Sequence, residues 1–407
     1  MLSFPADFLW GAASAPHQVE GNNVNSDFWM QEPHMTGADR SGDALDSYNR
    51  YPKDITLVAD SGLDTYRFGI EWARIEPAPG QFSRVQLAHY RRMIDTALDA
   101  GVRPFVTLHH FTSPRWFTEE GGWRSPQAID RFRAYVEVVT TILDGVEWVC
   151  TINEPNMLAI MVEEAEAALD PNSDTEWLSP TLEADMPRPV KPAPSQEIGR
   201  RLIEAHHAAR GIVRERTGAR VGWSVASRAF ETRPGAEEVR RRLEYVWEDL
   251  YLEAAADDDY IGVQAYSAQW VGLDGIEPHP VHPDNTLVRT AYRPDALGIA
   301  VRHTADVLPN VPVVVTENGI ATGDDTRRIA YTESALAALA EAMADGIDVR
   351  GYIHWSLLDN YEWGHWSPTF GLVAVDRETF ERQPKPSLAW LGDYATTQRS
   401  TGVGAAS

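Results

Sequence analysis

Short apolar stretches recur along the chain, and longer segments with an amphipathic repeat separate several of them. Short apolar runs of this kind are typical of buried parallel strands. Eight are found, at 8–13, 65–70, 103–108, 146–152, 220–225, 260–265, 311–316 and 351–355. Helical patterns cover 85–100, 196–217 and 332–344, and another begins at Ser125-Pro126, where Ser suits the N-cap and Pro the first turn. This alternation predicts an α/β fold, a closed parallel (β/α)8 TIM barrel.

Two of the predicted strands lead directly to a glutamate. Glu154 follows the run 149–152 and precedes Pro155, and Glu317 follows the run 311–315, with Gly319 close behind. The carboxyl ends of barrel strands carry the chemistry of such enzymes, and glycoside hydrolysis needs two carboxyl groups at one pocket. Asn-Glu-Pro alone often marks only a turn from strand to loop. Two glutamates at matching places in the repeat favour a catalytic pair.

The length and composition allow one large domain. The chain has 407 residues, of which 43% are hydrophobic, and α/β barrels often reach this size as one unit. We expect the barrel to occupy residues 1–395, with a long loop after the fourth strand at about 156–194, where acidic residues and prolines gather. Residues 396–407 are small and polar, which predicts a flexible tail.

Charge and cysteine content narrow the function further. The net charge is -24, a field that repels phosphate backbones and argues against nucleic-acid binding, and that favours neutral or cationic ligands. No apolar run is long enough to span a membrane, and 1–5 lacks the basic start of a signal peptide, so we expect a cytoplasmic protein. Cys150 is the only cysteine, which excludes an intrachain disulfide and predicts a buried thiol. The oligomeric state is left open.

The chain resembles the family 1 glycoside hydrolases, the β-glucosidase family, from Phe4 to about Trp390. Each string that carries the resemblance could arise by chance, but their order along one chain is specific. The strings are Phe8-Leu9-Trp10-Gly11-Ala12-Ala13, Gln18-Val19-Glu20-Gly21, Tyr66-Arg67-Phe68-Gly69-Ile70-Glu71-Trp72, Thr151-Ile152-Asn153-Glu154-Pro155, Thr316-Glu317-Asn318-Gly319 and Trp355-Ser356-Leu357-Leu358-Asp359-Asn360-Tyr361-Glu362-Trp363. The resemblance implies retaining hydrolysis of β-linked glycosides without a metal or an organic cofactor.

The same resemblance implies a role for each matching residue. Glu317 is similar to the family nucleophile, with Arg67 as its natural partner, and Glu154 to the acid/base, whose pKa should be raised. Retention implies carboxyl groups about 5–5.5 Å apart. Tyr266 is similar to the tyrosine that contacts the nucleophile. The substrate-binding positions are Gln18, His110, Asn153, Trp355, Glu362 and Trp363.

Several positions depart from the family pattern and put the identity of the sugar and aglycone in doubt. Phe111 stands where Trp is common and Gln264 where Asn is usual. The segment Gly364-His365-Trp366-Ser367-Pro368 stands where many members have Ala-Glu-Gly-Tyr. The stretch near the last strand lacks a phosphate-binding lysine, and Glu362 would repel phosphate, so we do not expect a 6-phospho-sugar substrate.

The same residues are compatible with more than one function. We expect a glycosidase acting on β-D-glucosides, with β-galactosides or β-fucosides as side activities. A transglycosylase would use the same residues, with aromatic residues around Trp116 and Trp270 on the acceptor side. A sugar-binding relative without activity is disfavoured because both glutamates are present. His109 and His110 could be read as metal ligands, but adjacent residues at a strand end point in opposite directions.

Overall fold

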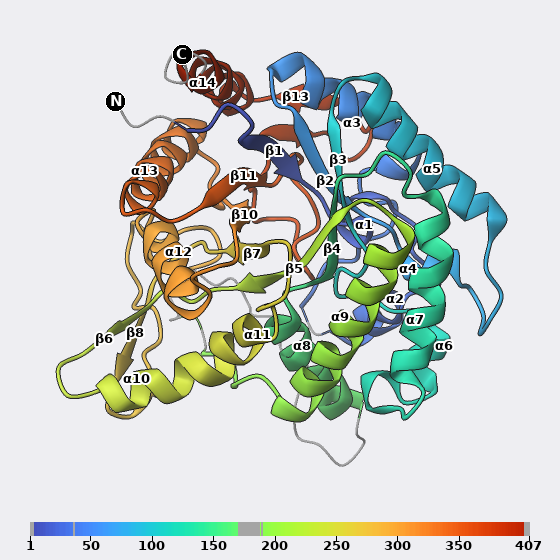
Figure 1. Cartoon of the computed structure of the whole chain (residues 1–407), viewed down its shortest axis with the longest axis horizontal. Coiled ribbons are helices and arrows are strands. Elements are labelled where there is room, and N and C mark those ends of the chain that lie inside the picture. The colour runs from blue at the N-terminus through green and yellow to red at the C-terminus, as the bar shows by residue number, and fades with distance from the viewer. Residues whose placement is uncertain (1–3, 36, 170–187, 189, 403–407) are drawn as a thin grey trace.

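A closed barrel of eight parallel strands forms the centre of the protein (Figure 1). The computed structural model describes residues 4–35, 37–169, 188 and 190–402. The strands are β1 (Leu9–Ala13), β2 (Thr65–Gly69), β3 (Arg103–Thr107), β4 (Trp148–Asn153), β5 (Arg220–Ala226), β7 (Ile261–Gln264), β10 (Val313–Asn318) and β11 (Val349–Trp355). Their order in space is their order in sequence, and β1 pairs with β11 to close the ring. The predicted fold is confirmed, and each predicted strand is present to within a few residues.

Helices surround the strands (Figure 1). Those around the barrel are α3 (Ser47–Ser61), α5 (Arg84–Asp99), α7 (Ala128–Val139), α8 (Pro155–Leu169), α9 (Gln196–Arg216), α11 (Leu250–Glu253), α12 (Ala296–Val307), α13 (Asp325–Ala344) and α14 (Pro386–Gly402), while α10 (Glu237–Glu244) packs on the small sheet that contains β6 and β8. Local sequence sets their ends. Ser83 caps α5 by accepting a hydrogen bond from the Gln86 backbone N–H, and Gly101, at φ 72, follows that helix in a conformation that favours glycine.

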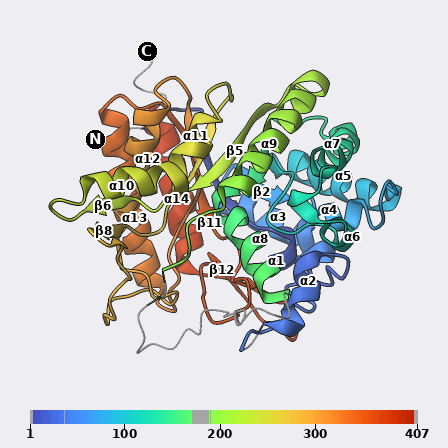
Figure 2. The same ribbon diagram turned by 90° about the horizontal axis from the view of Figure 1, so that it is seen from below.

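Short helices, turns and strands occupy the connections between the main elements. They are the helices α1 (Pro16–Val19), α2 (Asp27–Gln31), α4 (Trp72–Ile75) and α6 (Arg115–Glu119), the 3-10 turns Glu32–His34, Gly122–Arg124 and Thr140–Ile142, the π-helical turn Tyr245–Asp249, the sheet β6 (Phe230–Thr232), β8 (Gln269–Gly272) and β9 (Gly275–Ile276), and the pair β12 (Val373–Val375) and β13 (Arg382–Pro384). Figure 2 shows α1, α2 and β12 at one end of the barrel. Helices α1 and α2 follow β1, and β12 follows β11, so β1 and β11 finish at this end. The barrel strands are parallel, so β4 finishes there too.

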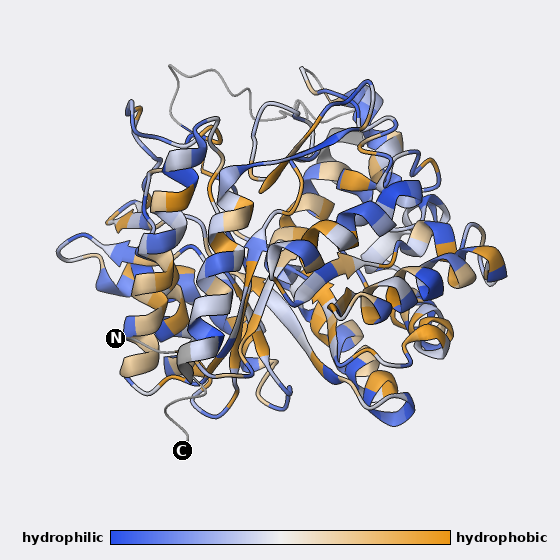
Figure 3. Ribbon diagram, turned by 90° about the horizontal axis from the view of Figure 1, so that it is seen from above, coloured by the Kyte–Doolittle hydropathy of each residue, from blue (hydrophilic) through white to orange (hydrophobic). Residues whose placement is uncertain are grey.

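Two apolar layers hold the barrel together. Hydrophobic residues gather where the helices face the strands, and hydrophilic residues cover the outer helix faces (Figure 3). Inside the barrel a second cluster contains Leu9, Phe105, Trp148, Tyr260 and Ile353. Strands with both faces buried read as continuous apolar runs, which is why the pattern of the sequence revealed them.

The structure corrects three boundaries. Residues 155–169 form helix α8, where we expected a loop from 156, because Ile160 and Met157 pack against Phe230 and Trp247; the predicted loop over 170–187 lies outside the described residues. Helix α14 continues to Gly402, through most of the predicted tail, and Arg399 pairs with Asp64 at 2.9 Å. The last five residues also lie outside the described part. Finally, Glu317 lies within β10 rather than beyond its end.

Among the described residues, no helix is both long and apolar enough to cross a membrane. Cys150 is buried in β4, as expected. The burial of this thiol and its place among the inward-facing side chains of the barrel agree with a packing role.

Candidate active site

Glu317 lies near the carboxyl end of β10 and has a donor for each carboxyl oxygen. Arg67, from β2, donates Nη1–H to Oε1 at 2.6 Å, and the Tyr266 hydroxyl donates to Oε2 at 2.6 Å. The Arg67 side chain is fully buried. The closed barrel explains the contact, because β1 and β11 separate β2 from β10 in the ring and the two side chains meet in the barrel interior.

The surroundings of Glu317 act on its pKa in two directions. On balance the pKa of Glu317 lies above its ordinary value, because burial raises it more than the Arg67 charge and then the hydrogen bond from Tyr266 lower it. Gln264 also contributes a hydrogen bond that favours the carboxylate. Three donors that all favour the charged form prepare this carboxyl to hold a negative charge.

Glu154 is the first residue beyond β4 and has a different environment. Its backbone φ is 43, a left-handed conformation that is uncommon for residues other than glycine and is found at functional sites. Its backbone N–H donates to the Ser224 carbonyl at 2.8 Å. Among the described residues its carboxyl has no hydrogen-bond partner. Burial and then the Glu317 charge raise the pKa of Glu154 to about 8, against the opposing charge of Arg228.

Asn153 shares Arg67 with Glu317 and belongs to the same hydrogen-bond network. Its Oδ1 accepts from Arg67 Nη2 and, at 2.8 Å, from Gln264 Nε2. Burial lowers the pKa of His110 well below its ordinary value, so this imidazole is neutral and its Nε2 can accept from Asn153 Nδ2 at 3.2 Å. Arg67 therefore holds Asn153 and Glu317 in one fixed arrangement.

Aromatic and polar groups from the segment after β11 form the inner wall. Trp355 donates Nε1–H to Glu362 Oε1 at 3.0 Å, and burial raises the pKa of Glu362 to about 8. The Trp363 ring stacks on His17 with centroids 5.8 Å apart. Gln18 lies behind this wall and donates to the Tyr361 carbonyl at 2.9 Å. The wall offers flat apolar faces and both donors and acceptors, which suits a sugar.

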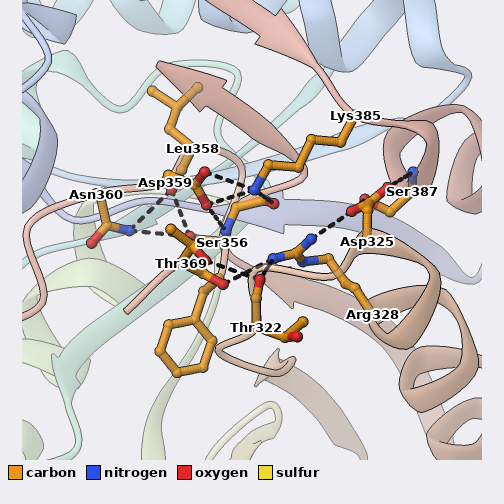
Figure 4. Close-up of polar contacts among 12 residues, drawn as sticks. Thr322, Asp325, Arg328, Ser356, Leu358, Asp359, Asn360, Thr369, Lys385 and Ser387 are labelled. Atoms are coloured by element: carbon orange, nitrogen blue, oxygen red, sulfur yellow. Dashed lines mark hydrogen bonds and ion pairs between the residues drawn. The ribbon is translucent and has the colours of Figure 1, made fainter. Parts of the chain in front are cut away.

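A buried polar cluster supports that wall from behind (Figure 4). Lys385 Nζ donates to Asp359 Oδ1 and to the Gly371 carbonyl, each at 2.8 Å. Asn360 Nδ2 donates to Ser356 Oγ at 3.1 Å, while its Oδ1 accepts from Gln18 at 2.9 Å. These bonds fix the segment between Trp355 and Trp363, so the side chains at its two ends keep their positions.

One pocket brings most of the predicted residues together. Its lining includes the predicted residues His110, Asn153, Glu154, Tyr266, Glu317, Trp355, Glu362 and Trp363. Arg67 and Gln18 act from behind the lining. Of the residues that depart from the family pattern, Phe111, Gln264 and His365 also line the pocket, whereas Trp366 packs on Tyr361.

The structure does not bring every candidate to this pocket. Trp116 donates to the Glu76 carbonyl and packs against Trp72, and Trp270 lies in β8 beneath the Arg233 guanidinium. His109 turns away toward Ser113, at 3.0 Å. Within the described ranges, no group of three or more His, Cys, Asp or Glu side chains is placed to hold a metal ion.

Sequence reasoning also missed part of the lining. Arg188, Arg228 and His279 lie in the pocket, together with Met157 and Met161 on α8. Arg228 stands two residues beyond β5, so the rule that strand ends carry chemistry could have found it. The others come from long connections without a recognisable string.

Comparisons with known proteins agree with this geometry. A family model described as Glycosyl hydrolase family 1 matches residues 1–176 and 254–400. The chain is 32% identical to thermostable β-glucosidase B of Thermobispora bispora, over 96% of this chain and 90% of that protein, and 29% identical to β-glucosidase A of Thermotoga maritima, over 98% of each.

Solved structures give the same result. The crystal structure of β-glycosidase BGL167 is 40% identical, with a TM-score of 0.85 and 97% of each chain covered. The β-glycosidase from Pyrococcus horikoshii is 30% identical, with a TM-score of 0.83, over 98% of this chain and 96% of that one.

Proposed function

This chain belongs to glycosyl hydrolase family 1, and from that premise we propose that it hydrolyses terminal β-linked sugars with retention of configuration, through a covalent glycosyl-enzyme intermediate. The observation that carries the proposal is the unequal environment of the two glutamates at one pocket. Glu317 has a hydrogen-bond donor on each carboxyl oxygen, whereas burial and the neighbouring charge raise the pKa of Glu154 to about 8. A double displacement needs one carboxylate and one carboxylic acid in these places.

In the first step, a Glu317 oxygen forms a bond to the anomeric carbon. The bond between that carbon and the leaving oxygen breaks, and its electron pair stays on the leaving oxygen. Glu154 gives its proton to this oxygen. Arg67 and Tyr266 hold the attacking carboxylate in a single orientation before the substrate arrives, which lowers the entropic cost of reaching the transition state.

In the second step, Glu154 acts as a base. Esterification removes the negative charge of Glu317, and that charge is the second largest cause of the raised pKa of Glu154. The pKa of Glu154 therefore falls, and its carboxylate can take a proton from water. The water oxygen bonds to the anomeric carbon while Glu317 leaves, so both carboxyl groups return to their starting states.

The inner wall fits a hexose with free hydroxyl groups. We assign β-D-glucosides as the main substrates, with β-galactosides and β-fucosides as side activities, because several relatives bear the name β-glucosidase. His110 and Glu362 would bind the hydroxyl groups, with Gln18 supporting Glu362 by a hydrogen bond from behind, and the Asn153 amide would bind the hydroxyl group nearest the anomeric carbon. Glu362 is protonated at neutral pH, since its pKa is about 8, and so can both donate and accept.

The transglycosylase alternative gains no support from the pocket. Trp116 and Trp270 are the residues expected to form an acceptor surface. Within the described part of the chain, both pack away from the pocket, Trp116 against the Glu76 carbonyl and Trp270 beneath Arg233.

The configuration of the first product tests the proposal. Hydrolysis of p-nitrophenyl β-D-glucoside is followed by proton NMR before mutarotation equalises the anomers. We expect the β-anomer to appear first. Initial release of the α-anomer would show inversion and overturn the mechanism, and the Glu317→Ala variant serves as the control for contaminating activity.

A further inference from the structure

One part of the pocket lining has no role in the chemistry described so far. Helix α8, Arg188, the residues just beyond β5 and the segment 279–290 supply it. It comprises Met157, Met161, Arg188, Ser227, Arg228, His279, Thr286, Val288, Arg289 and Thr290. The whole chain has a net charge of -24, yet this part of the pocket lining carries three arginines among the described residues. Positive side chains gathered at one place in a negatively charged protein favour the binding of an anion there.

Arg228 is buried close to the acid/base. Its guanidinium lies 4.3 Å from the centre of the Trp247 ring, and its Nη2 contacts the Met157 sulfur at 3.3 Å. Its Nε is buried and has no hydrogen-bond partner in the described part of the chain. Two acidic groups, Glu154 and Glu248, act on the Arg228 charge. Glu248 already accepts from the Arg228 backbone N–H at 2.7 Å and from the Ser227 hydroxyl at 2.8 Å. Donor capacity of this buried cation therefore remains in the pocket.

Arg188 reaches the same space from another segment. It donates Nη1–H to the Val288 carbonyl at 3.2 Å. Burial, with repulsion from Arg228 and Arg289, lowers its pKa to about 10. The same causes, burial and the charges of Arg188 and Arg228, lower the pKa of His279 to about 4, so this imidazole is neutral. An anion between these side chains would relieve the repulsion and make charge-assisted hydrogen bonds.

The position of Arg228 identifies the part of the substrate that would reach this subsite. The Arg228 charge lowers the pKa of Glu154, which places the guanidinium within electrostatic range of the proton donor. Glu154 faces the leaving oxygen in the proposed mechanism, so groups beyond it face the aglycone. Lys191 does not contribute a free charge, because it pairs with both carboxyl oxygens of Glu164 at 2.8 and 2.9 Å.

We propose that Arg188 and Arg228 form a subsite for an oxyanion, a carboxylate or a phosphate, carried by the aglycone, so that β-glucosides of acidic aglycones are preferred substrates. The inference rests on the proposed function, because it takes Glu154 as the group that faces the leaving oxygen. Met157, Met161 and Val288 add apolar surface beside the cations, which suits an aromatic ring that bears the anionic group. The sequence alone favoured neutral or cationic ligands, and the local arrangement of charges reverses that expectation.

A matched pair of glucosides tests the proposal. The pair is 4-carboxyphenyl β-D-glucoside and its uncharged isostere, 4-carbamoylphenyl β-D-glucoside. The ratio of their kcat/KM values is measured for the wild type, Arg228→Gln and Arg188→Gln. Because leaving-group reactivity is the same in every variant, a change in the ratio reports the interaction with the charge alone. We expect the ratio to fall about tenfold or more in each variant, the usual loss for a hydrogen bond to a charged group.

Arg350→Gln is the control. This exposed arginine pairs with Asp348 at the amino end of β11, away from the pocket, and its removal changes the net charge equally. Its ratio should equal that of the wild type. A 4-phosphonooxyphenyl glucoside then separates phosphate from carboxylate, because the anion that fits gives the larger ratio over the carbamoyl compound. Equal ratios in all four proteins, or a wild type that prefers the carbamoyl compound after correction for leaving-group reactivity, would overturn the proposal.

Binding separates failure of this proposal from failure of the proposed function. Both glucosides are titrated calorimetrically into Glu154→Gln, and into the same protein with Arg228→Gln added. Tighter binding of the carboxylate that disappears with Arg228 supports the subsite even if neither compound is hydrolysed. Equal binding of the two glucosides contradicts the subsite even if both are hydrolysed. Far-ultraviolet circular dichroism checks that each variant is folded, and the wild-type preference should weaken as salt rises.

Discussion

The ends of β4 and β10 carry the same side chain in opposite settings. At the end of β10, Glu317 has an arginine on one oxygen and a tyrosine on the other, and the pair is buried. At the end of β4, Glu154 stands in a left-handed conformation, without a partner for its carboxyl among the described residues, and its pKa rises to about 8. One carboxyl is thus supplied with donors and the other is deprived of them. Both residues are glutamates, so their neighbouring groups, rather than the residue type, make one carboxyl suited to act as the acid and the other as the nucleophile.

The partners of Glu317 also explain why the site is fixed. Buried charges are costly unless they are paired, and removal of one partner leaves the other uncompensated. Arg67 satisfies this condition with Glu317 and Asn153 together, so the proposed nucleophile, Asn153 and strand β2 form one unit. Glu154 needs no such partner while it keeps its proton.

We expect the largest effect from removing Glu317, the proposed nucleophile. In Glu317→Ala, we expect kcat for p-nitrophenyl β-D-glucoside to fall by about 10⁴-fold to 10⁶-fold, as in other hydrolases that lose a nucleophile. Added azide should restore turnover and give the α-glucosyl azide, because the small anion enters from the face that Glu317 occupied. Steady-state kinetics and NMR of the product measure both. A variant that keeps a tenth of the wild-type rate would contradict the assignment.

Removing the acid should have a smaller effect that depends on the leaving group. In Glu154→Ala, the rate for glucosides of poor leaving groups should fall by about 10²-fold to 10⁴-fold, the usual contribution of general acid catalysis. The first step with 2,4-dinitrophenyl β-D-glucoside should be nearly unaffected, since that phenolate needs no proton. Azide should now give the β-glucosyl azide. An equal loss for both leaving groups would assign the acid to another residue.

Removing one donor from Glu317 should make the two carboxyls more alike. Tyr266→Phe deletes the 2.6 Å hydrogen bond to Oε2 and keeps the ring. We expect kcat/KM to fall by about 10-fold to 100-fold, in line with a lost hydrogen bond to a charged group. The loss of a donor to the carboxylate should also raise the pKa of Glu317 and move the acidic limb of the pH profile upward. A profile of kcat/KM against pH for both proteins decides the matter, and an unmoved acidic limb would count against the proposed contact.

The smallest expected effect is a shift in the pH dependence that Glu154 gives to kcat/KM. Its pKa of about 8 predicts that kcat/KM falls as pH rises through about 8, because the acid loses its proton. Arg228 lowers this pKa by favouring the carboxylate, so Arg228→Gln should move the basic limb to higher pH by less than about one unit. Arg350→Gln should leave the limb in place. A shift to lower pH in Arg228→Gln would show that the charge does not reach Glu154.

The sequence predicted the barrel and most of the candidate site for identifiable reasons. The eight strands are buried on both faces, which makes their apolar runs visible, and Glu154, Asn153 and Glu317 stand at strand ends that a parallel barrel brings to one place. What the sequence did not reveal depends on contacts between distant segments. Helix α8 forms because its apolar face meets Trp247 and Phe230, and Arg188 reaches the pocket from a connection without periodicity.

The tryptophans show most clearly what the sequence alone cannot predict about the site. Trp355 and Trp363 line the pocket as predicted, whereas Trp116 and Trp270 do not, although all four are flat apolar side chains near strand ends or loops. Residue type says that a tryptophan can contact a sugar. Only the packing of its neighbours decides whether its ring faces the pocket or the core.

The most direct test of the account is to trap the covalent intermediate. The protein is incubated with 2,4-dinitrophenyl 2-deoxy-2-fluoro-β-D-glucoside, whose fluorine slows the second step more than its activated leaving group slows the first. Intact mass and peptide mapping then locate the sugar. The account predicts one fluoroglucosyl group per chain, esterified to Glu317. A label on a different residue, or no covalent adduct in protein that hydrolyses β-glucosides, would contradict it.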